Sequence, residues 1–300
     1  VPSPKIIMDA FAEVKPKMIV AVPLIIEKII KTRVFPLLEK PLIKLMMMVP
    51  LVDTQLLSRI KSRLTETFGG NLHQMIIGGA ALNKDVEQFL KKIDFPYTIG
   101  YGMTECAPLI SYAPWQENKL ASCGRVVSRM ELQIDSPDAA NIAGELWVKG
   151  DNVMMGYYKN EEATQTSFKD NWMKTGDLAL MDSEGFLFLK GRCKNMILGP
   201  SGQNIYPEEI EDLLNNMPYV NESIVTDENG KLVALVYPDF ENAEKSGYTS
   251  KEIDSLMEEN RINLNKELPA YSQITQIILR SEEFEKTPKR SIKRYMYTHQ

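Results

Sequence analysis

Apolar side chains in the first hundred residues recur at helical spacing and are interrupted by short runs that are apolar throughout. One helix is predicted to open at Pro23, because proline fits the first helical turn, where its missing N–H is not needed. A second is predicted to start at a capping Asp53 and to end at the glycine pair beginning with Gly69, and a third to follow a capping Asn83. The strands predicted between helices are Met75–Ile77 and Pro96–Ile99. This alternation indicates a mainly parallel, doubly wound α/β sheet.

From Gly124 to Lys190 the helical period fades, and short β segments alternate with turn residues. The pattern predicts a small β-barrel or sheet subdomain. Its predicted strands are Met130–Ile134, Glu145–Val148, Ala179–Met181 and Phe186–Leu189.

The last third is predicted to form a compact α+β unit. A helix is expected to begin at Pro207, and the turn Asp227–Gly230 between two apolar runs is a good hairpin signal. Thr249 and Glu252 have capping-box spacing ahead of a helix that reaches about Leu268. The strands predicted here are Glu222–Thr226, Lys231–Tyr237 and Gln273–Leu279.

The formal net charge is −5, from 35 basic and 40 acidic residues. That balance disfavours a general nucleic-acid-binding protein, because neutralising phosphates needs a clustered basic surface. Three widely spaced cysteines and two histidines give no argument for a structural zinc site, and so few thiols fit a cytoplasmic location. One local exception to the acidic balance is a basic tail containing Lys286, Lys289, Arg290, Lys293 and Arg294.

The most apolar stretch, Leu42–Val52, contains Lys44 and Pro50 and is far shorter than the ~20 residues that a membrane-spanning helix needs. The first residues form no signal peptide and include no initiator methionine, so we expect the chain to begin inside a longer protein. Peripheral contact of Met46–Met48 with a membrane surface stays open, and the sequence predicts no oligomeric state.

Four motifs follow one another along the chain, and no Walker loop, Rossmann glycine fingerprint or GxSxG elbow is present in the sequence. They are IIGGAAL (Ile76–Leu82), GYGMTE (Gly100–Glu105), KTGDLA (Lys174–Ala179) and KGRCKNMI (Lys190–Ile197), with GELWVKGDNVMMGYYKN between the second and third. In this order they resemble the adenylate-forming superfamily, and the chain is similar to the C-terminal portion of an AMP-forming acyl-CoA synthetase.

The resemblance implies part of a doubly wound α/β large domain with a β-barrel subdomain, followed by a small α+β domain. The implied divisions are residues 1–118 for the C-terminal half of the large domain, 119–191 for the barrel-like subdomain and 192–300 for a mobile C-terminal domain. Further stretches resemble the long-chain fatty acid–CoA ligases in particular, namely Lys15–Lys31, Ser201–Glu211 and Glu285–Tyr297.

The implied activity uses ATP and Mg²⁺ to convert a fatty acid to acyl-AMP, releases pyrophosphate and transfers the acyl group to CoA. The expected partners are therefore these small molecules and not nucleic acids. Two alternatives stay open: another adenylate-forming ligase, acting on aryl acids or loading an acyl carrier protein, and a non-catalytic scaffold that retains the fold.

The glycines of the first two motifs let a flat ring approach the backbone, because no Cβ stands in the way. Gly78, Gly79 and Ala80 follow one predicted strand, and Tyr101 and Gly102 follow the next. In the family these segments flank the adenine. The alternative for each is a tight βα turn with a packed aromatic side chain.

Thr104 offers a hydroxyl donor for a phosphate oxygen, and Glu105 offers a hard oxygen ligand for Mg²⁺; helix capping is the alternative for both. The resemblance gives Asp177 and Arg192 contacts with the ribose, the alternative for Arg192 being a surface cation. It places Lys194 at the hinge about which the C-terminal domain moves, a role that needs backbone freedom more than a side chain.

Two departures from the family pattern stand out. The Thr/Ser/Gly-rich phosphate loop has no counterpart in the chain, so we expect this portion alone to be inactive. Near the C-terminus Ser291 occupies the position of the family's catalytic lysine, and a hydroxyl cannot offset the charge of two approaching anions. Our hypothesis is that Lys289 or Lys293 takes over this role, the alternative being a solvated basic tail.

Overall fold

The computed structural model describes residues 4–49, 52–287 and 291–298 of the chain. Contacts between Cα atoms divide it into two compact units. The first runs to Thr175 and includes Ala179–Leu189, and the second comprises Gly176–Leu178 and the chain from Lys190 onward.

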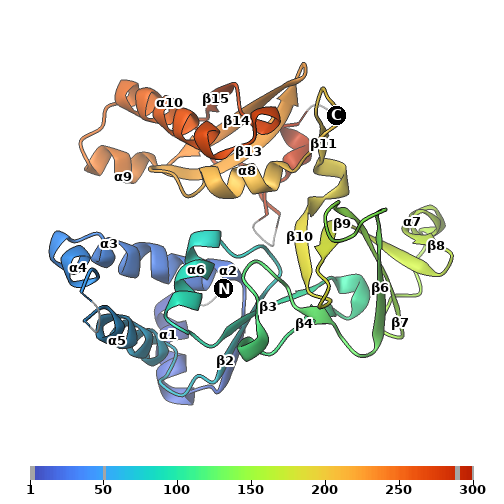
Figure 1. Ribbon diagram of the computed structural model, residues 1–300, viewed down its shortest axis with the longest axis horizontal. Helices are drawn as coiled ribbons and strands as arrows, with labels where there is room; N and C mark the ends of the chain where they lie inside the picture. The colour runs from blue at the N-terminus through green and yellow to red at the C-terminus, as the bar shows by residue number, and fades with distance from the viewer. Residues whose placement is uncertain (1–3, 50–51, 288–290, 299–300) are drawn as a thin grey trace. The chain divides into compact units, whose positions relative to one another are not determined.

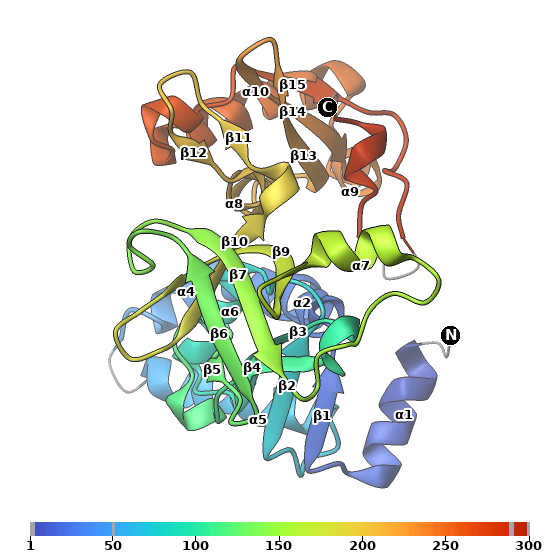
Figure 2. The ribbon, with the colours of Figure 1, turned by 90° about the vertical axis from the view of Figure 1, so that its right-hand side faces the viewer.

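A five-stranded sheet organises the first part of unit one, in the order β1-β2-β3-β4-β5. The first three strands run parallel, whereas β4 pairs antiparallel with both β3 and β5. Figure 2 shows β1, β2 and β3 side by side. The mainly parallel arrangement that the sequence predicted is confirmed in these three strands. The strands are β1 (Met18–Ala21), β2 (Gln74–Gly78), β3 (Tyr97–Gly102), β4 (Leu109–Tyr112) and β5 (Arg125–Val126).

Helices cover one face of the parallel strands. Ile19, Met75 and Ile77 point into a core that also receives buried residues of α2, α5 and α6. On the opposite face Val20 of the edge strand β1 is 75% exposed. The described helices of this region are α1 (Pro4–Val14), α2 (Pro23–Ile29), a π-helical turn (Ile30–Val34), α3 (Phe35–Leu38), α4 (Pro41–Met46), α5 (Val52–Thr67) and α6 (Lys84–Lys92), coloured blue to cyan in Figure 1.

The local helix signals were correct at α2, at α6 and at the glycine pair that ends α5, and wrong at the start of α5. Pro23 occupies the first turn of α2, and the Asn83 side chain accepts a 3.2 Å hydrogen bond from the Val86 N–H at the start of α6. The described part of α5 begins at Val52, so Asp53 lies inside the first turn instead of preceding the helix. Its carboxylate accepts a hydrogen bond from the neighbouring Thr54 N–H, at 2.6 Å.

A second, curled sheet has the order β10-β9-β7-β6, and the short β8 pairs with β9. The KTGDLA motif lies inside β9, which begins several residues before the predicted Ala179. The predicted β subdomain is present, and the helix α7 (Glu161–Ser167) beside it was not predicted. The strands are β6 (Met130–Asp135), β7 (Gly144–Gly150), β8 (Phe168–Lys169), β9 (Trp172–Met181) and β10 (Leu187–Arg192).

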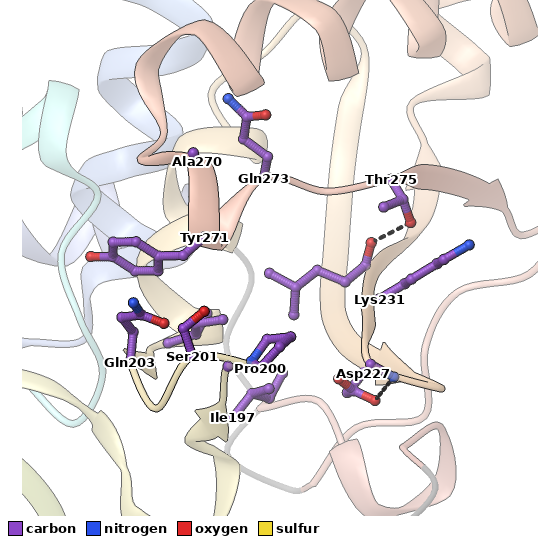
Figure 3. A pocket seen from close by; sticks show the side chains of 14 residues that line it. Ile197, Pro200, Ser201, Gln203, Asp227, Lys231, Ala270, Tyr271, Gln273 and Thr275 are labelled. Atoms are coloured by element: carbon purple, nitrogen blue, oxygen red, sulfur yellow. Dashed lines mark hydrogen bonds between the residues drawn. The ribbon is translucent and has the colours of Figure 1, made fainter.

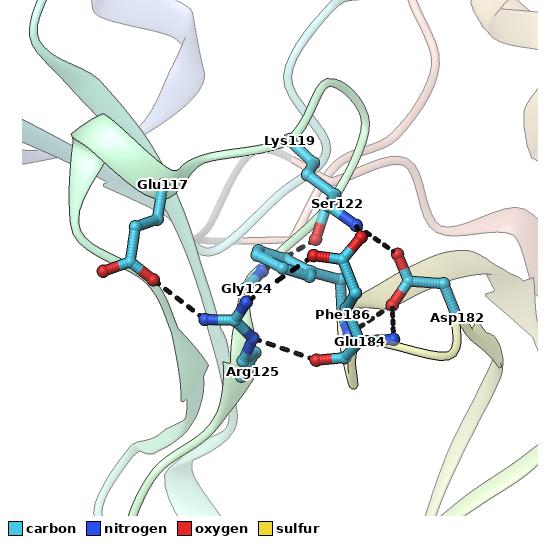
Figure 4. A network of polar contacts seen from close by, with 8 residues as sticks. All are labelled: Glu117, Lys119, Ser122, Gly124, Arg125, Asp182, Glu184 and Phe186. Atoms are coloured by element: carbon cyan, nitrogen blue, oxygen red, sulfur yellow. Dashed lines mark hydrogen bonds and ion pairs between the residues drawn. The ribbon is translucent and has the colours of Figure 1, made fainter.

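A polar cluster fastens the segment before β5 to the turn between β9 and β10 (Figure 4). Lys119 contacts the carboxylates of Asp182 and Glu184 at 2.7 and 2.6 Å. The Lys119 ammonium and the Arg125 guanidinium also lie 4.4 and 4.1 Å from the centre of the buried Phe186 ring. Cations over an aromatic face are attracted by its quadrupole, so these charges serve packing within unit one.

The second unit contains a three-stranded sheet in the order β13-β14-β15, with α8 and α10 contributing to its apolar core. Asn229 and Gly230, both with positive φ, form the two-residue hairpin loop, and the predicted capping box of Thr249 and Glu252 is present. The predicted strand at Gln273 begins only at Gln276 and runs parallel to β14. The elements are β11 (Ile197–Leu198), β12 (Asn204–Ile205), α8 (Pro207–Leu214), β13 (Val220–Glu228), β14 (Lys231–Pro238), α9 (Phe240–Lys245), α10 (Ser250–Glu267) and β15 (Gln276–Leu279).

A buried ion pair joins the C-terminal tail to α8. Arg294 donates to both carboxylate oxygens of Glu211 at 2.6 Å, and the Val225 N–H donates to the same carboxylate at 2.6 Å. Burial raises the pKa of Glu211 to about 7, although Arg294 and the Val225 amide favour the charged form. The carboxylate therefore depends on its partners to remain ionised.

Replacing Arg294 by alanine should destabilise the second unit by about 3–5 kcal/mol at pH 8, because the unpaired Glu211 must then either stay charged in the interior or take up a proton that is scarce at this pH. The loss should be smaller at pH 5. Without Arg294 the pKa of Glu211 rises further, so the orphaned carboxyl binds a proton and no buried charge remains. Urea unfolding at the two pH values measures the difference.

Lys245→Ala is the control, since the Lys245–Glu241 pair is exposed and should contribute less than about 1 kcal/mol. Equal destabilisation of the Arg294 variant at both pH values would contradict the assigned role of the pair.

Candidate functional site

Two strand ends bring the glycine motifs side by side. Gly78 of β2 lies opposite Gly100 of β3. A Cβ atom at Gly78 would lie 2.9 Å from the Gly100 carbonyl oxygen, so this contact leaves no room for a side chain. Gly79 has a φ of +87°, which residues with a side chain rarely adopt. The chain therefore bends away directly after β2, and Ala80 is exposed in this bend.

Gly102 marks a similarly close contact at the end of β3. A Cβ atom there would lie 2.0 Å from the Pro108 carbonyl oxygen, which also accepts a 2.9 Å hydrogen bond from the Met103 N–H. Tyr101, between the two glycines, is only 9% exposed and belongs to the core cluster that contains Cys106 and Ile110. The Tyr101 ring is therefore packed in the core, which agrees with the alternative of a tight turn with a packed aromatic side chain. Stacking of this ring on a base stays a prediction.

Thr104 and Glu105 lie in the turn that follows β3. Thr104–Cys106 forms a single 3-10 turn, in which the Thr104 side chain is exposed and Glu105 is half-buried. The polar pair therefore emerges directly beyond the end of a buried strand, where a ligand can reach it.

Tyr157 is a residue of this site that the sequence analysis did not assign. Its hydroxyl donates to Glu105 Oε1 at 2.9 Å, and its own N–H donates to Thr164 Oγ1 at 2.9 Å. Partial burial and the contact with Glu105 raise the pKa of Tyr157, so the phenol keeps its proton and remains a donor. The GYYKN sequence was noted as part of the family pattern, but nothing local in it indicates Glu105 as the partner.

The backbone of the same segment also holds the turn. The Met154 N–H donates to the Glu105 carbonyl oxygen at 2.7 Å, and the Asn152 side-chain amide donates to the Cys106 carbonyl oxygen at 2.6 Å. Burial, with a smaller effect from Glu105, raises the pKa of the Cys106 thiol to about 11. Burial therefore favours the protonated form of the adjacent thiol at neutral pH.

A Mg²⁺ ion fits Glu105 as a carboxylate ligand. In the described part of the chain no group of three or more His, Cys, Asp and Glu side chains could enclose a metal ion. Mg²⁺ commonly binds through one or two carboxylates and takes its remaining ligands from water and substrate phosphates. Glu105 suits that mode of binding.

Asp177 and Arg192 are brought together within the second unit. Arg192 Nε lies 2.9 Å from Asp177 Oδ1, and the Asp177 side chain is the less exposed of the two. Gly176 precedes Asp177 with a φ of +71°, and a Cβ atom there would lie 3.6 Å from Arg192 Nη1. Arg192 thus orients the carboxylate to which the resemblance gives a ribose contact, and this contact stays a prediction.

Lys194 is exposed in a 3-10 turn after β10. A residue before this turn and the last residue of the turn are both fastened to the start of α8. Lys190 pairs with Glu209 at 2.6 Å, and the Asn195 amide donates to Glu208 at 2.6 Å. The turn is therefore part of the second unit, and the hinge role of Lys194 stays a prediction.

In the tail, Ser291 closes a short loop by accepting a 2.8 Å hydrogen bond from the Thr287 N–H at its carbonyl oxygen. Lys293 Nζ lies 3.6 Å from the Glu285 carboxylate. Lys289 lies outside the described residues. The hypothesis that Lys289 or Lys293 replaces the missing catalytic lysine stays untested.

A hollow of about 260 Å³ in the second unit contains none of the predicted site residues (Figure 3). Apolar residues such as Ile197 and Leu232 line it together with the polar Ser201 and Gln203 and the ring of Tyr271. The side-chain oxygen of Gln203 is buried without a hydrogen-bond partner. This mixed lining is suited to a ligand with both an apolar and a hydrogen-bonding part.

Comparison with known proteins identifies the family. Residues 1–158 match the family model described as AMP-binding enzyme, and residues 194–300 match that of the AMP-binding enzyme C-terminal domain. The chain belongs to the AMP-binding enzyme family. The predicted family membership and the α/β class with a curled β sheet are thereby confirmed.

Curated relatives in this family include two kinds of CoA ligase. The chain is 40% identical to a 2-succinylbenzoate–CoA ligase of Bacillus pumilus over 186 residues, which are 60% of this chain and 37% of the relative. It is also 40% identical to a long-chain-fatty-acid–CoA ligase of Escherichia coli over 158 residues, 51% of this chain and 28% of the relative. The chain therefore matches about a third of the length of these proteins.

A solved structure shares the fold over nearly the whole chain. The O-succinylbenzoate CoA synthetase of Bacillus subtilis in complex with AMP has a TM-score of 0.71 at 23% identity, covering 99% of this chain and 53% of that one. Such identity shows a common fold and leaves the substrate undecided.

Replacing Gly102 by alanine should destabilise the first unit by about 1–3 kcal/mol, because the new Cβ would collide with the Pro108 carbonyl oxygen and push β3 away from β4. Gly100→Ala is the matched control in the same strand, since its Cβ would meet only ordinary contacts at 3.5 Å and beyond. Thermal unfolding of both variants gives the comparison. Equal stability of the two would show that the close contact at Gly102 does not constrain the turn.

Proposed function

We propose that the full-length protein is an AMP-forming CoA ligase whose substrate is a long-chain fatty acid. One observation carries the proposal: the Thr104–Glu105 turn leaves the end of β3 beside the glycine contact between Gly78 and Gly100. The side-chain oxygens of Thr104 and Glu105 are suited to bind a phosphate group and its cation, and the glycine backbone beside them has no side chain that would block the ligand. The family membership of residues 1–158 supports the same assignment.

In the first step a carboxylate oxygen of the acid attacks the α-phosphorus of ATP, and the bond to the pyrophosphate oxygen breaks. The products are acyl-AMP and pyrophosphate. Repulsion between the carboxylate and the triphosphate is the main obstacle, so charge stabilisation and positioning supply the catalysis. Mg²⁺, held through Glu105, would neutralise phosphate charge, while the Thr104 hydroxyl donates to a phosphate oxygen.

In the second step the deprotonated thiol of CoA attacks the acyl carbonyl carbon, and AMP leaves as the phosphate anion. Asp177, oriented by Arg192, holds the ribose hydroxyls in this proposal. Lys289 or Lys293 supplies the cation that Ser291 cannot. The small number of cysteines, three in 300 residues, supports action in the cytoplasm, where thiols remain reduced.

The choice of a long-chain acid rests on the stretches Lys15–Lys31, Ser201–Glu211 and Glu285–Tyr297, which resemble that branch. The apolar side chains of α2 are suited to contact with an alkyl chain, although Ile26 also serves the core. The second candidate is an aryl-type acid, favoured by the 40% identity with the 2-succinylbenzoate ligase.

The test is carboxylate-dependent exchange between pyrophosphate and ATP by the full-length protein, followed by CoA-dependent release of AMP. Palmitate should support both reactions, with kcat/KM at least tenfold above octanoate and 2-succinylbenzoate. A preference for 2-succinylbenzoate would establish the aryl alternative. If none of the acids supported exchange, the result would favour a non-catalytic scaffold. Alanine at both Lys289 and Lys293 in the same assay tests the two lysines.

Tyr157→Phe should raise the Mg²⁺ concentration needed for half-maximal exchange by about threefold to tenfold, because Glu105 loses a donor that fixes its orientation. The melting temperature should be unchanged, since the ring itself remains. Tyr158→Phe is the matched control, because this neighbouring side chain is 88% exposed. An unchanged Mg²⁺ requirement in the Tyr157 variant would remove Tyr157 from the site.

A further inference from the structure

The tail that follows β15 folds back on itself as a short hairpin within the second unit. Lys286 and Ile292 form an antiparallel bridge, and the Lys293 N–H donates to the Glu285 carbonyl oxygen at 2.8 Å. Lys293 therefore lies opposite Glu285 in this hairpin. The Lys293 ammonium lies 3.6 Å from the Glu285 carboxylate, which agrees with this register.

The two faces of the hairpin have different surroundings. Side chains alternate between the faces of a strand, so Lys286 and its partner Ile292 share one face. The Lys286 ammonium lies 2.6 Å from the carboxylate of Glu222 in β13, so this face is turned toward the sheet. Ser291 and Lys293 share the other face, two residues apart. A cation at Lys293 therefore points to the same side of the hairpin as the serine hydroxyl.

The other described cations of the tail are held more firmly than Lys293. Lys286 contacts a second carboxylate, that of Glu283, at 2.9 Å, and the Arg294 guanidinium contacts the buried Glu211 at 2.6 Å. The partner of Lys293 is a Glu285 side chain that is 61% exposed. Exposed ion pairs contribute little free energy, so the Lys293 ammonium can exchange this carboxylate for another anion.

Arg280, Phe284 and Tyr297 form a clasp at the base of the hairpin. The rings of Phe284 and Tyr297 meet edge to face, with their centres 5.0 Å apart. The Arg280 guanidinium lies 4.9 Å from the centre of the Phe284 ring and 4.7 Å from that of Tyr297. Aromatic pairs and cation–π contacts of this kind stabilise one arrangement of the rings. The clasp therefore fixes where the Tyr297 hydroxyl lies.

Hydrogen bonds connect the clasp to the sheet on one side and to Lys293 on the other. The Arg280 N–H donates to the carbonyl oxygen of Val236 in β14 at 2.7 Å. The Tyr297 hydroxyl accepts a hydrogen bond from the Glu285 N–H at 2.8 Å. The carbonyl oxygen of the same Glu285 accepts from the Lys293 N–H. The backbone of Glu285 thus carries the contact from Tyr297 to Lys293.

We propose that Tyr297 is a positioning residue for acyl-adenylate formation, and that it acts by holding the hairpin from which Lys293 presents its ammonium. The inference rests on the proposed ligase function. It names Lys293 as the lysine that supplies the cation absent at Ser291, because the two residues share a face of the hairpin. The Lys293 ammonium would leave Glu285 for the negative charge of the bound nucleotide and acid.

The experiment measures exchange between pyrophosphate and ATP by the full-length protein, with palmitate and with 2-succinylbenzoate as the acid. Lys293→Gln should lower kcat/KM for this exchange by about a hundredfold, since it removes a charge that stabilises the transition state. Tyr297→Phe should lower it by about fivefold to tenfold, because the hydroxyl is lost and the ring is kept. Tyr295→Phe is the matched control in the same tail, since this side chain is 68% exposed, and it should leave the exchange unchanged.

A double variant separates positioning from general stability. If Tyr297 acts through Lys293, then Tyr297→Phe should cause no further loss in a protein that already carries Lys293→Gln. General destabilisation would instead multiply the two losses. A second readout needs no activity: the Lys293 N–H should exchange its hydrogen at least about fivefold faster in Tyr297→Phe than in the wild type or in Tyr295→Phe.

Full activity of the Tyr297 variant would overturn the inference, and so would multiplied losses in the double variant or unchanged hydrogen exchange at Lys293. A larger loss with Lys289→Gln than with Lys293→Gln would also reject it. Failure of the proposed function has a different signature, because the wild-type protein would then support pyrophosphate exchange with neither acid. In that case the positioning role falls together with the function on which it rests.

Discussion

The close contact between the ends of β2 and β3 is the constraint on which the candidate site depends. Gly78 and Gly100 face each other where a Cβ would come within 2.9 Å of a carbonyl oxygen, and Gly102 meets Pro108 still more closely. Since no side chain fits at Gly78 or Gly102, the backbone itself forms this edge of the sheet. Thr104 and Glu105 follow within one turn, so strand packing decides where their backbone lies, and the hydrogen bond from Tyr157 holds the Glu105 side chain.

The sequence correctly predicted those helix caps and turns that depend on only a few neighbouring residues. Asn83 caps α6, Thr249 and Glu252 form their capping box, and Asn229-Gly230 makes the hairpin loop, because each depends on side chains within three residues. The prediction failed where the bounds of an element depend on residues that are distant in the sequence. β9 begins well before its apolar run, because polar residues such as Thr175 are held there by hydrogen bonds to another strand, 29 positions away.

The residues of the candidate site also differ in how far the sequence predicts them. Its motif residues were found from their order along the chain, but their partners were not. Tyr157 reaches Glu105 across 52 positions, and the Asp177–Arg192 pair joins two motifs that were assigned separately to the ribose. Neither contact leaves a periodicity in the sequence, because a single hydrogen bond between distant segments requires only one suitable residue on each. Such partners become visible only when the strands that carry them are placed.

The tail shows why a change at position 291, to which the family resemblance gives a catalytic lysine, need not disturb the fold. Arg294 fixes the tail through Glu211 and Val225, with three hydrogen bonds of 2.6 to 3.0 Å. Ser291 contributes to its loop through backbone groups, its N–H donating to Thr287 Oγ1 at 3.3 Å and its carbonyl oxygen accepting from the Thr287 N–H. Many side chains at position 291 are compatible with such bonds. Packing therefore constrains the side chain of Arg294 and not that of residue 291, so the folded tail does not depend on whether serine or lysine stands there.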